Sequence, residues 1–197
     1  MLLKSQDQLQ PETTVAFVPQ YIIKNGLRFD WETKINEKNQ WLQVGPQLYF
    51  DETGSNLSND NYEELKGLGL DLHHKIYLIE EKQGHGPYFS YGLIYQFHSL
   101  DYSNFQWTSY EEDGLSYSEY TNTLNNQTIH KTGLNVIFGY QLVRFKRLFL
   151  DAYVGTGIRI SFRKGDSEDI PQYNSSIMDY GYSGTLLVGG IRFGVVL

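Results

Sequence analysis

The sequence contains no cysteine, no long apolar run and no basic tract. The lack of cysteine excludes disulfide bonds, thiol chemistry and cysteine-type metal sites. No segment approaches the roughly 18 consecutive apolar residues that mark a membrane-spanning helix. The 16 lysines and arginines are outnumbered by 23 aspartates and glutamates, which gives a formal net charge of −7. Because binding to phosphates needs clustered cationic side chains, we expect no nucleic-acid partner.

Tyrosine and glycine are abundant, with 16 and 19 residues in a chain of 197, and this length suits one domain. A membrane β-barrel turns only alternate residues toward lipid, so a negative mean hydropathy is compatible with a membrane location. Residues 1–12 lack the apolar core of about 7–15 residues that a secretory signal carries. We interpret them as a periplasmic N-terminal segment, and we expect an export signal to have been cleaved or left out of this sequence.

Apolar and polar residues alternate with a period of two in eight segments, which is typical of strands with two different faces. The clearest case is residues 27–35, where large apolar side chains alternate with charged ones. Asn25-Gly26 predicts a two-residue hairpin after the first strand, because both residues tolerate positive φ. The eight predicted strands cover residues 13–23, 27–35, 41–50, 68–78, 88–102, 129–142, 148–161 and 184–197.

The connections alternate between short turns and long loops. An even number of strands with short turns at one end and long loops at the other is the outer-membrane pattern, with both termini periplasmic. Since the last strand reaches the final residue, we expect a single barrel domain over residues 1–197. The long loops carry most of the acidic residues, including Asp179 and the cluster Glu111-Glu112-Asp113. The predicted short turns are 36–40, 79–87 and 145–147, and the predicted long loops are 51–67, 103–128 and 162–183.

The alternation alone fits either a soluble lipocalin-like barrel with an apolar interior or a membrane barrel with a polar one. The interior of an eight-stranded barrel is just wide enough to be filled by side chains, and about forty large apolar residues exceed what it holds. The polar face is rich in glycine and carries nearly balanced charges. Because buried ions persist only when they are paired, this balance suits an interior face. We therefore predict a polar lumen. Its predicted ionic network consists of Arg28, Asp30, Glu32, Lys34, Asp71, His73, Lys75, Asp151, Arg159 and Arg192.

Four stretches carry a resemblance to a known family: TVAFVPQYIIKNGLRFDWETKI, GLNVIFGYQLVR, LFLDAYVGTGIRISF and LLVGGIRFGVVL. With these strands the chain resembles small OmpA/OmpX-like outer-membrane barrel domains. The resemblance implies an all-β, eight-stranded antiparallel up-and-down transmembrane β-barrel with an envelope-structural, adhesive or accessory role. The family's last strand commonly ends in an aromatic residue that the barrel-assembly machinery recognises. This chain departs from that pattern, since it ends in Leu197 with Phe193 four residues earlier.

Only residues 97–104 invite a catalytic interpretation, because some small outer-membrane barrels modify lipids with a rim serine, histidine and carboxylate. His98 and Ser99 are neighbours on a strand and point to opposite faces, so they form no nucleophile–base pair without a bulge. His98 and Ser103 could meet only if the strand ends between them. We expect no enzymatic activity, no cofactor and no metal site.

His73 and His74 also point to opposite faces of a strand and cannot bind one metal ion together. His74 falls on the lipid-facing set, which indicates either a position at the membrane interface or a lateral contact with a partner protein. The aromatic residues near strand ends, Trp41, Tyr88, Trp107 and Tyr110, are either an interfacial girdle or ordinary strand-end residues. The acidic clusters are interpreted as solvated loops.

The leading hypothesis is a non-enzymatic outer-membrane barrel with a plugged lumen. It would lie in the lipid bilayer as a structural or accessory subunit of a larger cell-envelope complex, with acidic extracellular loops. The alternatives are a rim-located lipid-modifying enzyme, a narrow solute pore and a soluble ligand-binding barrel.

Overall fold

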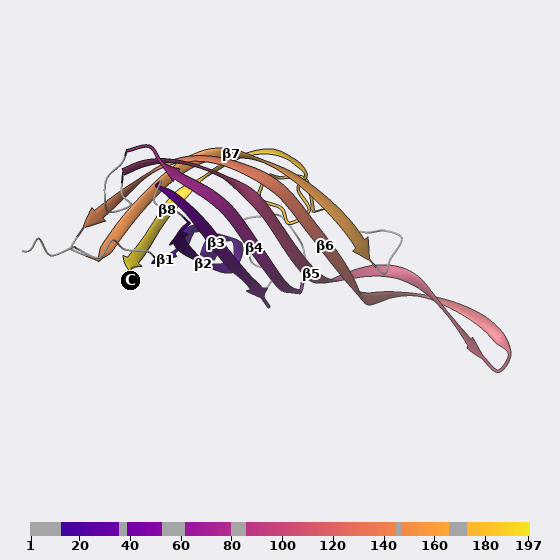
Figure 1. The fold of residues 1–197 in the computed structure, drawn as a ribbon. Coiled ribbons are helices and arrows are strands. Elements are labelled where there is room, and N and C mark those ends of the chain that lie inside the picture. Colours follow the sequence, from indigo (N-terminus) through magenta and orange to yellow (C-terminus); the bar gives the residue numbers. More distant parts are fainter. Residues whose placement is uncertain (1–12, 36–38, 53–61, 80–85, 145–146, 166–172) are drawn as a thin grey trace, which may run out of the picture.

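The computed structural model shows one closed barrel of eight antiparallel strands, as predicted. It describes residues 13–35, 39–52, 62–79, 86–144, 147–165 and 173–197. Each strand pairs with the next along the chain, and the last pairs with the first (Figure 1). The strands are β1 (Thr13–Phe17), β2 (Gly26–Lys34), β3 (Gln40–Asp51), β4 (Glu64–Tyr77), β5 (Gly86–Glu112), β6 (Leu115–Arg144), β7 (Leu148–Gly165) and β8 (Gly184–Val196). No helix in these stretches is long and apolar enough to cross a membrane.

The two ends of the barrel differ. The amide of Leu197 donates to the carbonyl of Thr13 at 3.0 Å, so the first and last described residues lie at one end, which we call the periplasmic end. The β5–β6 hairpin leaves the opposite, extracellular end (Figure 1). The predicted N-terminal segment 1–12 and most of the predicted short turns lie outside the described residues.

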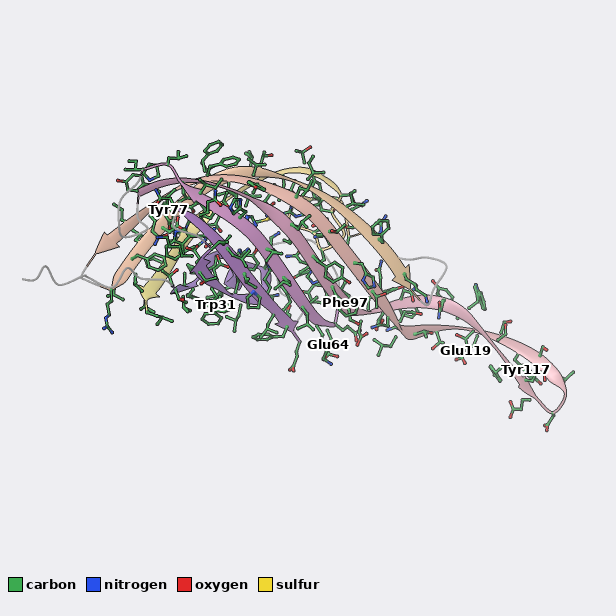
Figure 2. All side chains as sticks on the ribbon, viewed as in Figure 1. Trp31, Glu64, Tyr77, Phe97, Tyr117 and Glu119 are labelled. Atoms are coloured by element: carbon green, nitrogen blue, oxygen red, sulfur yellow. The ribbon has the colours of Figure 1, made fainter. Side chains whose placement is uncertain are left out.

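Polar side chains point into the barrel and apolar ones point outward, as predicted. On β2, Asp30 and Glu32 are at most 1% exposed, whereas Phe29 and Trp31 are each 51% exposed. Figure 2 shows side chains standing off the outside of the barrel wall along the edges of the view. A soluble lipocalin-like barrel needs the opposite arrangement, so that alternative is wrong.

The first strand is shorter than predicted, and the Asn-Gly hairpin is wrong. β1 ends at Phe17, and a 3-10 helix, η1 (Pro19–Lys24), follows. Proline has no N–H to donate to a neighbouring strand and its fixed φ suits the start of a helix. Asn25 does adopt the left-handed conformation, with φ of 53°, but it uses this to end η1. Tyr21 of η1 lies over the lumen, where its hydroxyl accepts a hydrogen bond from Arg28.

Residues 103–128, predicted as a loop, are strand. β5 and β6 stay paired without interruption from Gly86↔Gln141 to Glu112↔Leu115, and the turn is Asp113-Gly114, both with positive φ. Asp-Gly is a strong signal for a two-residue hairpin. Because both faces of this extension are exposed to solvent, it lacks the apolar–polar alternation by which the other strands were recognised. Strands β4 and β7 also reach farther toward the extracellular end than predicted.

Glycines make room for neighbouring side chains in the crowded lumen. A Cβ atom at Gly45 would lie 2.5 Å from Asp30 Oδ1, and one at Gly139 would lie 2.3 Å from the Tyr88 hydroxyl. At Gly92 the obstacle is backbone, since a Cβ there would lie 2.2 Å from the carbonyl oxygen of Leu72. The glycine-rich inner face is therefore a packing requirement of the narrow barrel.

Replacing Gly92 by alanine should destabilise the barrel by about 1–3 kcal/mol or more, because the β4 backbone cannot move away from the new methyl group. Urea unfolding in lipid vesicles, followed by tryptophan fluorescence, measures this loss. The matched control is Gly189→Ala on the outer face, where the nearest atom to the new Cβ is 3.3 Å away. Equal urea midpoints for the two variants would contradict the crowding argument.

Candidate functional site

A layer of buried polar side chains crosses the periplasmic half of the lumen. At its centre, Lys75 Nζ lies 3.1 Å from both carboxylate oxygens of Glu32, 2.9 Å from Gln141 Oε1 and 3.4 Å from Asp151 Oδ2. The ammonium group also lies 4.0 Å from the ring centre of Tyr88, whose hydroxyl donates to Asp151 at 2.8 Å. Every strand contributes one residue to this lumen layer, in order Thr14, Glu32, Gln43, Lys75, Tyr88, Gln141, Asp151 and Arg192.

A second group of ions continues from the lumen layer toward the extracellular end. Arg192 Nη1 donates to Gln43 Oε1 at 2.9 Å, and its Nε lies 3.1 Å from Asp30 Oδ2. Arg28 bridges Asp30 and Asp71. Each of these carboxylates therefore touches at least one cation, which is the condition under which charges persist in a dry interior.

Nine of the ten residues of the predicted ionic network are buried in the lumen, and Lys34 is partly exposed at the end of β2. His73 Nδ1 lies 3.1 Å from Ser90 Oγ, and its Nε2 lies 3.9 Å from Asp71 Oδ2. Arg159 stands apart from the other cations. Its Nη2 donates to Asn135 Oδ1 at 2.7 Å and its Nη1 donates to two backbone carbonyls, with no carboxylate among the described residues within ion-pair distance.

Aromatic residues close both ends of the lumen. Trp41, Tyr77 and Tyr88 form a buried cluster near the periplasmic end, so a girdle role for Trp41 and Tyr88 is wrong. Their register on β3 and β5 turns them inward. Trp107 and Tyr110 lie on the β5–β6 extension, beyond the barrel. A tyrosine-rich cap fills the extracellular end; it consists of Tyr49, Tyr62, Leu65, Leu100, Ile129, Tyr173 and Tyr180, with Tyr21 packed against it.

The outer surface of the barrel is a belt of exposed apolar side chains on successive strands. In water such a belt would be far larger than the apolar patches that soluble monomers expose. A closed barrel with an apolar exterior and an ionic interior is the architecture of outer-membrane proteins. This chain is an outer-membrane β-barrel. The belt includes Phe29, Trp31, Leu48, Phe50, Leu68, Leu70, Leu72, Leu93, Leu134, Phe138, Val154, Ile158, Ile160, Phe162, Ile191 and Phe193.

Comparison with known proteins gives few relatives. No protein-family model matches this barrel, and no curated protein matches its sequence. The crystal structure of Acinetobacter baumannii CarO superposes with a TM-score of 0.48 at 13% identity, covering 98% of this chain and all of that one. Acinetobacter baumannii CarO2 superposes with a TM-score of 0.42 at 12% identity, covering 94% and 97% of the two chains. Both TM-scores are below 0.5.

Residues 97–104, which invited a catalytic interpretation, are part of the continuous strand β5. His98 points inward, between the rings of Tyr49 and Tyr180 at centroid distances of 4.7 and 4.8 Å. Ser99 accepts a hydrogen bond from Asn126 at 2.9 Å, and Ser103 donates to Glu63. The β5–β6 register runs without a break from His98↔Ile129 to Ser103↔Leu124, so neither a bulge nor a strand end brings a serine to this histidine.

His74 lies on the outer face, as its position in the alternation predicts, and its Nδ1 lies 2.8 Å from the Tyr91 hydroxyl on β5. A lateral partner contact at this pair stays a prediction. No group of three or more potential metal ligands occurs in the described stretches. The cluster Glu111-Glu112-Asp113 lies at the hairpin tip. Asp179 is not a solvated loop residue, since it is fully buried and its carboxylate accepts from Ser175 Oγ at 2.9 Å.

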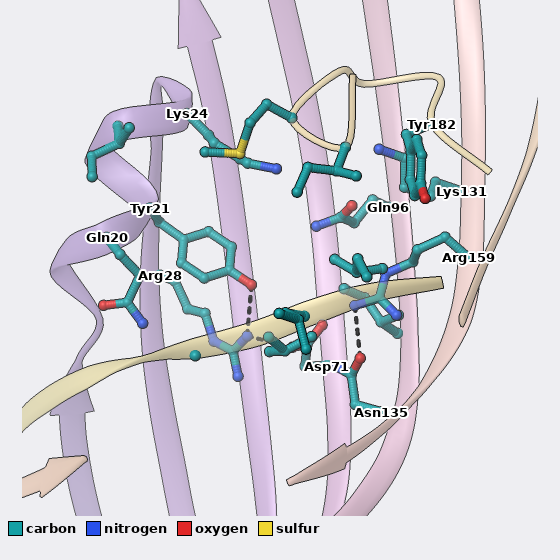
Figure 3. Close-up of a pocket in the computed structure, with 18 of the residues that line it drawn as sticks. Gln20, Tyr21, Lys24, Arg28, Asp71, Gln96, Lys131, Asn135, Arg159 and Tyr182 are labelled. Atoms are coloured by element: carbon teal, nitrogen blue, oxygen red, sulfur yellow. Dashed lines mark hydrogen bonds and ion pairs between the residues drawn. The ribbon is translucent and has the colours of Figure 1, made fainter. Parts of the chain in front are cut away.

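A cavity of about 270 Å³ remains in the extracellular half of the lumen, and sequence analysis did not predict it. Figure 3 shows Gln20, Tyr21 and Lys24 of η1 on one side, with Lys131 and Arg159 across from them. Pro19 is the one signal for this cavity in the sequence. A proline there ends the strand, so that a short helix forms part of the barrel wall in its place.

Replacing Lys75 by methionine should cost about 3–5 kcal/mol of folding free energy, because it leaves the buried carboxylates of Glu32 and Asp151 without their shared cation. The double variant with Glu32→Gln should recover part of this loss. Urea unfolding in vesicles measures both changes. The matched control is Lys66→Met, which removes a largely exposed lysine paired with Glu64 and should leave the urea midpoint unchanged. A Lys75→Met barrel as stable as the control would refute the buried ion-pair network.

Proposed function

We propose that this outer-membrane barrel is neither a pore nor an enzyme, and that it acts as an accessory subunit of a cell-envelope complex through its β5–β6 extension. The observation that carries the first half of the proposal is the lumen layer. Its eight residues come from all eight strands and are at most 3% exposed, which leaves no described path for water through that level of the barrel. The orientation of His98, Ser99 and Ser103 supports the absence of a hydrolase or acyltransferase site.

The β5–β6 extension supports the second half. Beyond Tyr102, which is buried in the barrel, about ten residues per strand project outward, roughly 30 Å at the usual rise of a strand. A lone two-stranded hairpin is only marginally stable in water. Because β5 and β6 stay regularly paired over this whole length, the extension needs stabilising contacts.

Aromatic side chains provide some of these contacts and also form an exposed surface. The rings of Phe105 and Tyr120 stack at 5.7 Å, and Trp107 contacts Tyr120 at 5.4 Å. Trp107 nevertheless remains 70% exposed. Rigid exposed aromatic residues are the side chains that most often anchor protein–protein interfaces. We therefore assign partner binding to this face of the extension. We also propose that the chain is a member of an OmpA/OmpX-like family.

The sealed lumen predicts that the purified chain gives no regular conductance steps in planar lipid bilayers. A variant that thins the lumen layer, Tyr88→Ala with Gln141→Ala, should produce small steps, because it removes two side chains that fill the cross-section. Regular steps from the unaltered chain would show that it is a pore and would end the first half of the proposal.

The extension predicts site-specific cross-links in intact cells. A photoreactive amino acid at position 107 should give a discrete adduct with another envelope protein, whereas the same group at position 138 on the apolar belt should not. A chain in which residues 104–123 are replaced by an Asn-Gly turn, joining the paired Ser103 and Leu124, should still fold and should lose the association. Adducts of equal yield at both positions, or none at position 107, would reject the docking role.

A further inference from the structure

The barrel wall has a lateral gap in its extracellular half. β8 pairs with β7 along its whole length, up to Gly184↔Arg159. Its other edge pairs with β1 only from Val196 to Phe193, because β1 ends at Phe17. Among the described residues, the edge of β8 from Gly184 to Arg192 therefore has no strand partner and faces η1.

The helix η1 covers only part of this edge. Gln20 packs against Gly190, where an added Cβ would lie 2.0 Å from the Gln20 amide nitrogen. Above that contact, the cavity reaches the outside, because its lining includes Leu187 and Gly189, which lie on the outer face of β8. The opening thus lies between η1 and the part of β8 from Leu186 to Gly189.

This opening lies at the level of the apolar belt. Thr185 of β8 pairs with Ile158 of β7, and β7 remains apolar on its outer face as far as Phe162. An exposed strand edge is not tolerated in hydrocarbon unless it lines a cavity or is covered. The residues at the mouth are themselves apolar and exposed, with Leu187 at 82%, and Ile23 and Ile177 about half exposed.

The inner wall of the cavity is cationic. Among its described lining residues, five are lysine or arginine and one, Asp71, carries a carboxylate, which is already paired with Arg28. Arg159 is 7% exposed and has no carboxylate partner in the described stretches. His98, 1% exposed, lines the same cavity, and neither of its ring nitrogens has a hydrogen-bond partner among the described residues.

The geometry points to a binding site for an anionic amphiphile that enters from the bilayer. Its carboxylate would lie near Arg159 and His98, and its alkyl chain would leave between η1 and β8 into the membrane. At about 30 Å³ for a water-sized group, the cavity holds on the order of nine such groups, enough for a head group and a few carbons but not for a long chain. The site does not depend on the docking role of the β5–β6 extension.

Photolabelling of the full chain in phosphatidylethanolamine–phosphatidylglycerol vesicles tests this, with palmitic acid carrying a diazirine on its chain as the probe. We expect saturable labelling of residues 18–25 and 184–191, competed by palmitate but not by hexadecanol or acetate. Arg159→Met should lower the apparent affinity at least tenfold, which corresponds to about 1.4 kcal/mol. Lys66→Met, which removes the same charge outside the cavity, should have no effect.

A second variant covers the case in which Arg159→Met does not fold. Leu187→Glu changes a side chain that is 82% exposed at the mouth, so the barrel should still form, and the added carboxylate should repel the probe. Labelling spread evenly over the belt, equal competition by hexadecanol, or unchanged labelling in folded Leu187→Glu would each overturn the inference. Equal competition by acetate would assign the site to a soluble anion and would overturn entry from the bilayer.

Discussion

The structure depends on the pairing of Lys75 and Arg192 with the carboxylates around them. An eight-stranded barrel brings side chains from every wall into one narrow space, and ions in that space are stable only when each has a partner. Glu32, which lies 3.1 Å from Lys75 and 3.2 Å from Arg192, is shared by both cations. The narrow space explains the glycines opposite the bulky residues. The need of each ion for a partner makes the lumen layer continuous.

The faces of the strands could be predicted because their cause is local. A one-residue shift in register exchanges the two faces of a strand, so an alternation of ionic and apolar residues shows which side chains share a face. The narrow interior of an eight-stranded barrel, which cannot hold the large apolar set, then shows which face points outward. Asp30 and Glu32 alternate with Phe29 and Trp31, so burying the first pair necessarily turns the second pair outward. The members of the ionic network could be predicted from the same alternation. Opposite charges at inward positions of neighbouring strands have few other groups with which to pair.

The features that the sequence did not reveal depend on contacts between distant segments. Tyr21 looks like a continuation of β1, but its hydroxyl accepts a hydrogen bond from Arg28 at 2.8 Å inside the barrel. Asp179 looks like one more acidic loop residue, yet it is buried where its carbonyl accepts from Lys131 at 3.0 Å. The β5–β6 extension has no buried face, so period-two alternation could not find it, although Asp113-Gly114 marked its turn.

The two halves of the barrel differ because β1 stops early. Below Phe17, the β1–β8 pairs close the wall, and paired ions fill the lumen together with buried glutamine and aromatic side chains. Above Phe17, the wall between β2 and β8 consists of η1, whose backbone cannot complete the sheet, and the carboxylates of the network lie mostly below this level. Arg159 and His98 are therefore left facing a cavity rather than a counter-ion. A continuous β1 would cover the edge of β8 and separate these groups from the membrane, so the same proline that shortens the strand also brings a buried cation within reach of lipid.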